Sequence, residues 1–172
     1  VIFKSYDIRG VFGETLNLQD AYKIGYSFAE FVDSETILIG HDGRLSNMEM
    51  LNAVASGISS NDKTIVYVGL VPTDVVYSLS GLLELPGVII TASHNPKEYN
   101  GLKLCNSGAV PIGEHSGLLK IKRHKLYRGF EGGRSWPDYL KEESAKLTGS
   151  LLPITQDSAR ELRGFYEFRC EI

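Results

Sequence analysis

Residues 87–104 read GVIITASHNPKEYNGLKL, and this stretch decides the fold class. It opens at residues 87–91 with a short apolar run rich in β-branched residues, which predicts a buried strand. A polar loop follows, and residues 101–104 predict a further strand. A buried strand that ends in a polar loop is typical of the central sheet of an α/β domain.

Two similar runs occur upstream, TILIG at residues 36–40 and TIVYV at residues 64–68, and each predicts a strand. Helical patterns separate these strands. Apolar residues at gaps of three and four predict a helix over residues 18–32, and Pro72 predicts the start of a helix that runs to Leu83. Ser46 and Glu49 have the spacing of a capping box, which predicts the start of a third helix with an apolar stripe at Met48, Leu51, Ala55 and Ile58.

This alternation predicts an α/β fold, a three-layer α/β/α domain with a mixed, largely parallel sheet. In such sheets ligands bind beyond the carboxyl ends of the strands. We therefore expect functional residues in the segments that follow the strands, which are residues 41–44, 69–72 and 92–100.

Composition excludes several classes of protein. The chain has 172 residues and a net charge of −3, which argues against a general nucleic-acid-binding protein, since such proteins need a basic surface. No run of about 18 apolar residues is present, so we expect no transmembrane helix and no membrane partner. The first residues lack the apolar segment of a signal peptide, and we interpret Cys105 and Cys170 as free thiols of a cytoplasmic protein.

The character of the sequence changes beyond residue 121. Residues 120–125 are strongly basic, and residues 129–135 contain three glycines, which predicts a loop. Residues 138–147 could form a short charged helix. Residues 155–172 have a helical composition without a clear apolar face.

The polar loop at residues 91–103 contains the candidate reactive residues. Ser93 is a hydroxyl nucleophile, and a serine hydroxyl reacts poorly unless a base or a local positive charge helps it. His94 and Lys103 could give that help, and Lys97 could hold phosphate oxygens. Pro96 stiffens the loop because its ring fixes φ. Composition alone leaves an ordinary polar loop as an equal alternative, and the absence of a G-x-S-x-G elbow makes a hydrolase a weak one.

Four motifs occur in a fixed order: YDIRG at residues 6–10, GHDGRLS at residues 40–46, VGLVPT at residues 68–73, and the loop at residues 91–103. In this order and spacing they resemble the α-D-phosphohexomutase family, of the phosphomannomutase/phosphoglucomutase type. The resemblance covers residues 2–122, and more loosely continues to residue 152. It implies that residues 1–133 are the N-terminal domain I, with a linking helix and divergent tail at residues 134–172.

The resemblance implies a role for each residue of these motifs. Phospho-Ser93 would donate its phosphoryl group to a hexose 1- or 6-phosphate, and a hexose bisphosphate would return the other phosphate. Arg9 and Lys103 would be cationic catalytic and substrate-binding residues, and we favour Lys103 for proton transfer. His94 would orient the loop or contact the sugar phosphate, and Tyr6 would touch the substrate or pack beside Arg9.

Other residues of these segments are expected to support the site. Asp42, Arg44 and Asn95 would brace it, because an arginine–carboxylate pair can lock such a turn. Asn100 and Gly101 predict a turn. No histidine has metal-ligand spacing with a cysteine, and we interpret three of them as surface or loop residues: His41, His115 and His124.

The resemblance also implies a Mg²⁺ cofactor, held by the phosphate on Ser93 and by three aspartates of an Asp-x-Asp-x-Asp-Arg loop in a second domain. These 172 residues contain no such loop, so we expect domains II–IV to be absent and to be partners of this chain. The alternative to a phosphohexomutase acting in a longer protein is therefore an inactive fragment or a remnant that binds sugar phosphates. A preference for mannose or glucose phosphates stays open.

Overall fold

The strands form one mixed sheet in the computed structural model, which describes residues 2–124 and 151–153. Within the described residues the sheet has seven strands, in the order β1-β5-β4-β2-β3-β7, with β6 paired to β5. Their bounds are Ile8–Val11 (β1), Thr36–His41 (β2), Thr64–Leu70 (β3), Gly87–Ile90 (β4), Tyr99–Asn106 (β5), Val110–Pro111 (β6) and Leu151–Pro153 (β7).

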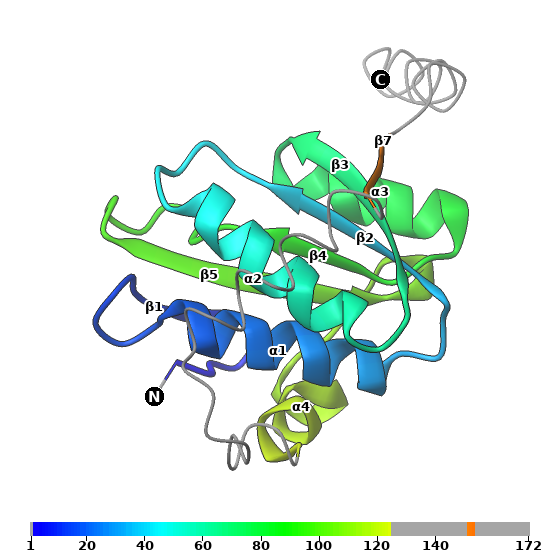
Figure 1. Cartoon of the computed structure of the whole chain (residues 1–172), viewed down its shortest axis with the longest axis horizontal. Helices are drawn as coiled ribbons and strands as arrows, with labels where there is room; N and C mark the ends of the chain where they lie inside the picture. The colour runs from blue at the N-terminus through cyan, green and yellow to red at the C-terminus, as the bar shows by residue number, and fades with distance from the viewer. Residues whose placement is uncertain (1, 125–150, 154–172) are drawn as a thin grey trace.

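The sheet is parallel in one half and antiparallel in the other. Strand β2 is parallel to β3 and β4, and β3 is parallel to β7. Strand β5 is antiparallel to β4, β1 and β6. As a result β1, β2 and β4 run in the same direction, and the loops that follow them lie at one end of the sheet, on the left of Figure 1.

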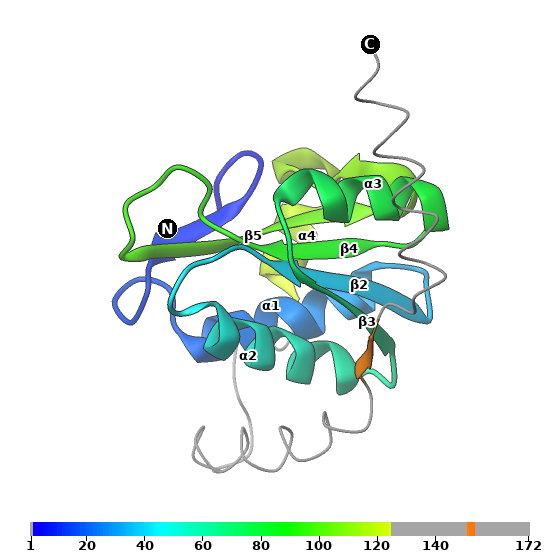
Figure 2. The same cartoon turned by 90° about the horizontal axis from the view of Figure 1, so that it is seen from above.

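Helices cover both faces of the sheet. Helices α1 (Leu18–Phe31) and α2 (Asn47–Ser59) lie on one face and α3 (Thr73–Leu83) lies on the other (Figure 2). Helix α4 (Leu119–Arg123) packs beside α1, and two short helical turns, Ser107–Ala109 and Glu114–Leu118, precede it. The predicted three-layer α/β fold is confirmed, and the predicted helix bounds differ from the observed ones by one residue or so.

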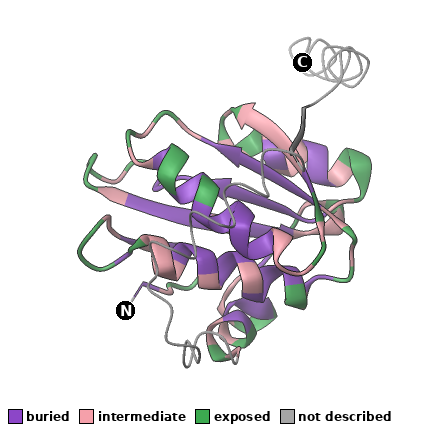
Figure 3. Cartoon of the chain, viewed as in Figure 1, coloured by how far each residue is buried: buried purple, intermediate pink, exposed green. Residues whose placement is uncertain are grey.

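The main core lies between the sheet and the α1–α2 pair. Ile37 and Ile39 of β2 and Ile8 of β1 are fully buried there against Phe28 of α1. Burial of one such side chain stabilises the fold by about 1.5–3 kcal/mol. Figure 3 shows the resulting pattern, with buried residues along the central strands and exposed residues in the loops at their ends.

Two glycines allow α1 and α2 to approach closely. A Cβ on Gly25 would lie 2.2 Å from the carbonyl oxygen of Val54, and a Cβ on Gly57 would lie 2.1 Å from that of Tyr22. No real Cβ atom tolerates such contacts, so the crossing of these helices requires glycine at both positions.

Three predictions from the sequence are wrong. Ser46 is the N-cap of α2 but forms no capping box, since its hydroxyl accepts a hydrogen bond from Asn100 Nδ2 (2.8 Å). Asn100 and Gly101 form no turn and lie inside β5. His41 is not a surface residue, because it is only 8% exposed and bonded on both ring nitrogens.

Other expectations concern residues that the structure does not describe. The helix predicted at residues 138–147, the domain boundary at residue 133 and the tail at residues 155–172 lie outside the described residues. Of the two cysteines, Cys105 is buried and free. None of the described helices has the length and apolar character needed to cross a membrane.

Candidate active site

Ser93 lies in the loop that joins β4 to β5, at the end of the sheet where the loops after β1 and β2 also lie. Thr91 and Ala92 before it are buried, whereas Ser93 is exposed. Its φ is +56°, in the left-handed region that costs most L-residues roughly 1–2 kcal/mol. Non-glycine residues held in this region cluster at functional sites.

The backbone of Ser93 is held by two side chains. Its N–H donates to Thr91 Oγ1 (2.8 Å), and its carbonyl oxygen accepts from Arg44 Nη2 (2.8 Å). Ser93 Oγ lies 3.3 Å from Nδ1 of the exposed His94. The Ser93 hydroxyl is therefore exposed beside the imidazole of His94, while Thr91 and Arg44 fix the Ser93 backbone.

Arg44 binds the whole loop. Its terminal nitrogens donate to four carbonyl oxygens, those of Ser93 (2.8 Å), Asn95 (2.7 Å), Pro96 (2.7 Å) and Tyr99 (2.8 Å). A guanidinium can donate four hydrogen bonds from its two terminal nitrogens in one plane, and no other side chain offers that many donors. With these donors occupied by the protein, Arg44 acts on the loop and not on a ligand.

Asp42 organises the turn after β2. Its side chain accepts hydrogen bonds from the hydroxyl of Thr91 (2.6 Å), the backbone N–H of Arg44 (3.1 Å) and the amide of Asn47. Arg44 Nε lies 3.5 Å from Asp42 Oδ2, which is an ionic contact but too long for a good hydrogen bond. In the same loop, Asn95 Nδ2 donates to the carbonyl of Ala92 (2.7 Å).

Asp7 joins the two predicted cationic residues. Its Oδ1 accepts from Arg9 Nε at 2.9 Å, and its Oδ2 lies 3.8 Å from Lys103 Nζ. The Asp7 side chain is 9% exposed, against 35% for Arg9 and 27% for Lys103. Two cations share one carboxylate, so this group has a net positive charge and suits an anionic ligand.

The sheet register places these residues on one face. Arg9 is opposite Gly101, and Thr91 N–H donates to the Gly101 carbonyl, so Arg9, Gly101 and Thr91 form a row across three strands. Lys103 lies two residues along β5 from Gly101 and therefore projects to the same face. Ser93 lies in the turn that follows Thr91.

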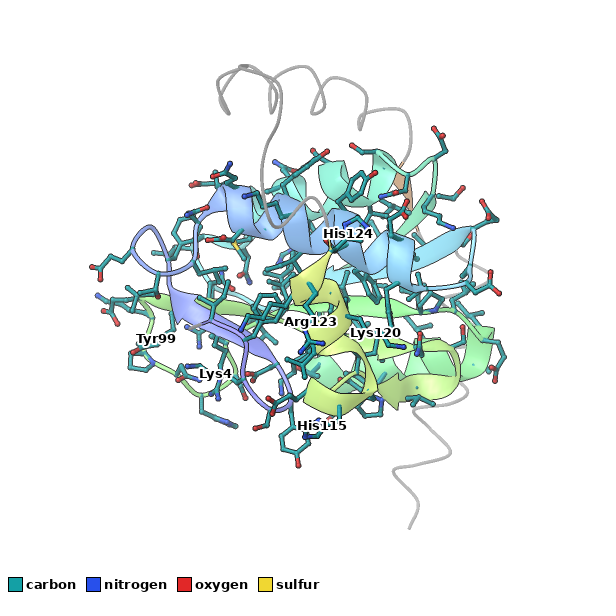
Figure 4. All side chains as sticks on the ribbon, turned by 90° about the horizontal axis from the view of Figure 1, so that it is seen from below. Lys4, Tyr99, His115, Lys120, Arg123 and His124 are labelled. Carbon is teal, nitrogen blue, oxygen red and sulfur yellow. The ribbon has the colours of Figure 1, made fainter. Side chains whose placement is uncertain are left out.

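Two cavities adjoin the loop, and Asn95 lines both. One of about 430 Å³ is lined by Ser93, Asp42, Gly43, Arg44, Leu45, Asn95 and Lys97. The other, of about 370 Å³, is lined by Ile2, Lys4, Arg9, Gly10, Val11, Thr15, Asn95 and Tyr99. Figure 4 shows Lys4 and Tyr99 near one another, away from the basic residues of α4. The described lining of the second cavity holds two cations and no acid.

Tyr77 on α3 lies near the cationic group. Burial, together with smaller contributions from the negative charges of Cys105 and Asp7, raises the pKa of Tyr77 to about 12. Burial also raises the pKa of the Cys105 thiol. Both groups therefore remain neutral at physiological pH.

Comparison with known proteins then gives the family. The family model described as "phosphoglucomutase/phosphomannomutase, alpha/beta/alpha domain I" matches residues 1–125. The chain belongs to this family. The phosphomannomutase of Escherichia coli (strain K12) is 40% identical over 122 residues, which are 70% of this chain and 27% of that relative. A phosphomannomutase of Klebsiella pneumoniae is 41% identical over 122 residues and is covered over 78% of its length.

Solved structures agree with this family fold. A phosphoglucomutase/phosphomannomutase family protein from Burkholderia thailandensis superposes with a TM-score of 0.62 at 30% identity, over 86% of this chain and 30% of that one. Parafusin, a phosphoglucomutase from Paramecium, shares the fold with a TM-score of 0.55 at 19% identity, over 85% of this chain and 31% of that one. The chain spans about a quarter of the length of the first curated relatives that it matches.

Within this family domain, Ser93 lies on a loop held by Arg44, and the predicted cations Arg9 and Lys103 meet at Asp7. The sequence did not predict that Asp7, Thr91 or Lys4 would lie among these residues. Asp7 directly precedes β1, two residues before Arg9, and the sequence did not predict this strand, so the contact of Asp7 with both cations could not be predicted either. Tyr6, predicted to touch substrate, is 79% exposed. Thr91 could not be identified from the sequence alone, because its contact with Asp42 depends on how the chain folds. The same holds for Lys4, which lines a cavity formed by several segments.

The described residues do not by themselves fit the implied Mg²⁺. No group of three or more His, Cys, Asp or Glu side chains among them could hold a metal ion. A phosphate on Ser93 would supply oxygen ligands, but no group of carboxylates among the described residues would complete the site.

Proposed function

We propose that Ser93 accepts and donates a phosphoryl group in the interconversion of hexose 1-phosphates and 6-phosphates, with mannose or glucose as the sugar. One observation carries this proposal: an exposed serine is fixed in a left-handed conformation after β4, in a loop that adjoins two cavities lined by cationic side chains. The relatives named phosphomannomutase support it. A cytoplasmic location goes with this proposal as a prediction.

The proposed transfer proceeds as follows. A hydroxyl oxygen of the hexose monophosphate attacks the phosphorus on Ser93, the bond between Oγ and phosphorus breaks, and Oγ keeps the electron pair. Lys103 first releases its ammonium proton to solvent, and as a neutral amine it accepts the hydroxyl proton. It then donates that proton to Oγ as the bond between Oγ and phosphorus breaks, so the protons balance over the step. The hexose bisphosphate then turns round, and its other phosphate returns to Ser93 by the reverse step. Such transfers depend mainly on positioning and charge.

The cations have distinct parts in this proposal. Arg9 keeps its charge at all relevant pH values and stabilises the negative charge of the moving phosphoryl group. Asp7, 3.8 Å from Lys103 Nζ, would stabilise the ammonium that forms when the amine accepts the proton. Lys4 and Lys97 line the two adjoining cavities, where they would attract the phosphates of the sugar.

The test is direct phosphorylation. The chain is incubated with glucose 1,6-bisphosphate and Mg²⁺, and we expect a mass increase of about 80 Da on the peptide that contains Ser93. Ser93→Ala should abolish the increase. Ser116→Ala, a control at another exposed serine, should retain it.

Phosphate on a different residue, or none on the wild-type chain, would show that Ser93 is not the acceptor. A glucose 1-phosphate to 6-phosphate assay on the same samples separates the two candidate functions. Phosphorylation with isomerisation indicates a mutase, and phosphorylation without it indicates a chain that binds and exchanges phosphate only.

A further inference from the structure

The backbone of Ser93 makes an unusual set of hydrogen bonds. Neither its N–H nor its carbonyl oxygen is bonded to a strand partner, and side chains from outside the residue bind both groups. A left-handed conformation at a residue with a Cβ persists only where the surroundings hold it. The contacts of Ser93 therefore identify what holds it.

Thr91 is the central contact. Its hydroxyl oxygen lies 2.6 Å from Asp42 Oδ2 and 2.8 Å from the nitrogen of Ser93. A carboxylate can only accept, so the single hydroxyl proton of Thr91 points to Asp42. The lone pairs of Thr91 are then left for the N–H of Ser93, and the direction of this chain of hydrogen bonds is fixed.

Asp42 is itself anchored to β3. His41 Nδ1 lies 2.7 Å from the Asp42 carbonyl oxygen, which only accepts, so Nδ1 carries the proton. His41 Nε2 then accepts from the hydroxyl of Tyr67 (2.7 Å), and the two rings stack with an angle of 10° between their planes. Tyr67 and His41 thus fix the backbone of Asp42, whose carboxylate separately accepts the hydrogen bond from Thr91.

We propose that Thr91 is a positioning residue for phosphoryl transfer, whose hydroxyl, aligned by Asp42, holds Ser93 in its left-handed conformation. This inference rests on the proposed function of Ser93. The φ of Ser93 sets the direction of its Cβ and hence of Oγ, and a displacement of about 1 Å at a reacting atom can slow a reaction 10²-fold. Loss of the Thr91 hydroxyl would slow transfer and leave sugar-phosphate binding nearly intact.

The experiment compares Thr91→Val with Thr91→Ser. Valine has nearly the shape of threonine without the hydroxyl, and serine keeps the hydroxyl. With glucose 1,6-bisphosphate as the donor, we expect Thr91→Val to lower the maximal rate of Ser93 phosphorylation about 10–100-fold, with the half-saturating donor concentration changed less than about threefold. Thr91→Ser should keep the rate within about threefold of wild type.

Amide hydrogen exchange at Ser93 tests the same contact without any phosphoryl transfer. We expect faster exchange in Thr91→Val and an unchanged rate in Thr91→Ser, because only the first removes the acceptor of the Ser93 N–H. If Thr91→Val does not fold, Thr91→Cys replaces it, since a thiol is a poor hydrogen-bonding group of similar size.

The outcomes separate the two proposals. Wild-type rates and wild-type exchange in Thr91→Val would overturn the positioning role even if Ser93 is phosphorylated. A wild-type chain that is never phosphorylated would overturn the proposed function, and the exchange rates would still decide whether Thr91 holds Ser93.

Discussion

The carboxylate of Asp7 is the point where three elements meet. Arg9 from β1 and Lys103 from β5 contact it directly, and its charge reaches Tyr77 on α3. Tyr77 is half-buried and its pKa is raised to about 12, chiefly by burial. A phenol in this position is a neutral hydroxyl at every pH where the domain works, and it therefore adds no negative charge beside the cations.

Tyr77 should make the stability of the domain fall at high pH. Between about pH 10 and pH 12 the unfolded chain loses the phenolic proton while the folded state keeps it, so the free energy of unfolding decreases as pH rises through this range. Tyr77→Phe should show a smaller decrease in urea unfolding at pH 9, 10 and 11. Tyr6→Phe is the control, since Tyr6 is 79% exposed. Equal slopes for wild type and Tyr77→Phe would contradict the burial of this phenol.

At the scale of elements, the closest contact in the fold is the crossing of α1 and α2. Gly25 and Gly57 each face a backbone carbonyl of the other helix, so no side chain separates the two helices there. The pair then presents one continuous apolar surface to the sheet, with Phe28 and Ile58 among its buried residues. The position of α2 in turn sets the turn that carries Asp42 and Arg44.

Two glycine-to-alanine substitutions should therefore have opposite signs. Alanine favours a helix over glycine by roughly 0.5–1 kcal/mol. Gly57→Ala should nevertheless destabilise the domain by about 1–3 kcal/mol, because its Cβ would meet the Tyr22 carbonyl. Gly81→Ala on α3, where the nearest atom would be 3.6 Å away, should be neutral or stabilising. Thermal unfolding of both variants measures the difference, and a stabilised Gly57→Ala would contradict the described crossing.

Elements with a strong local pattern were predictable from the sequence, and those that depend on distant contacts were not. Residues 36–40 and 64–68 are β-branched runs that have few alternatives to a buried strand. Strand β1 is only four residues long and contains Arg9 and Gly10, so it left no such pattern. Asn100 reads locally as a turn residue, but its amide donates to Ser46 and Asn47, which are more than 50 residues away in sequence. Tertiary contacts therefore overrode the local preference.

At the scale of the whole molecule, the two faces of the sheet differ in composition, since one is mainly apolar and the other includes charged residues. The α1–α2 face holds most of the apolar core. Helix α3 packs over β2 and β4 on the other face (Figure 2). Arg9 of β1 and Lys103 of β5 lie on that face nearer the β1 edge, where both contact Asp7. The chain has a net charge of −3, so the cations near this edge are a local exception that would direct an anion to the Ser93 loop.

Inorganic phosphate should bind at this edge. We expect amide NMR shifts at Arg9, Asn95 and Tyr99 on titration with phosphate, and weaker binding, by about 3–10-fold, in Lys4→Ala. Lys63→Ala is the control, since Lys63 lies at the opposite end of the sheet and pairs with Glu35. Added sodium chloride should weaken the binding through screening. Equal affinities in the two variants would exclude Lys4 from the site.

Gly101 limits how this domain can vary over generations. A Cβ there would lie 2.2 Å from the Ile8 carbonyl and 3.0 Å from Arg9 Cγ, so every missense change at its codon collides with the strand that carries Arg9. Such an allele would disturb the pairing of β1 with β5 and move Arg9 at the same time, so stability and the position of the cation depend on the same residue.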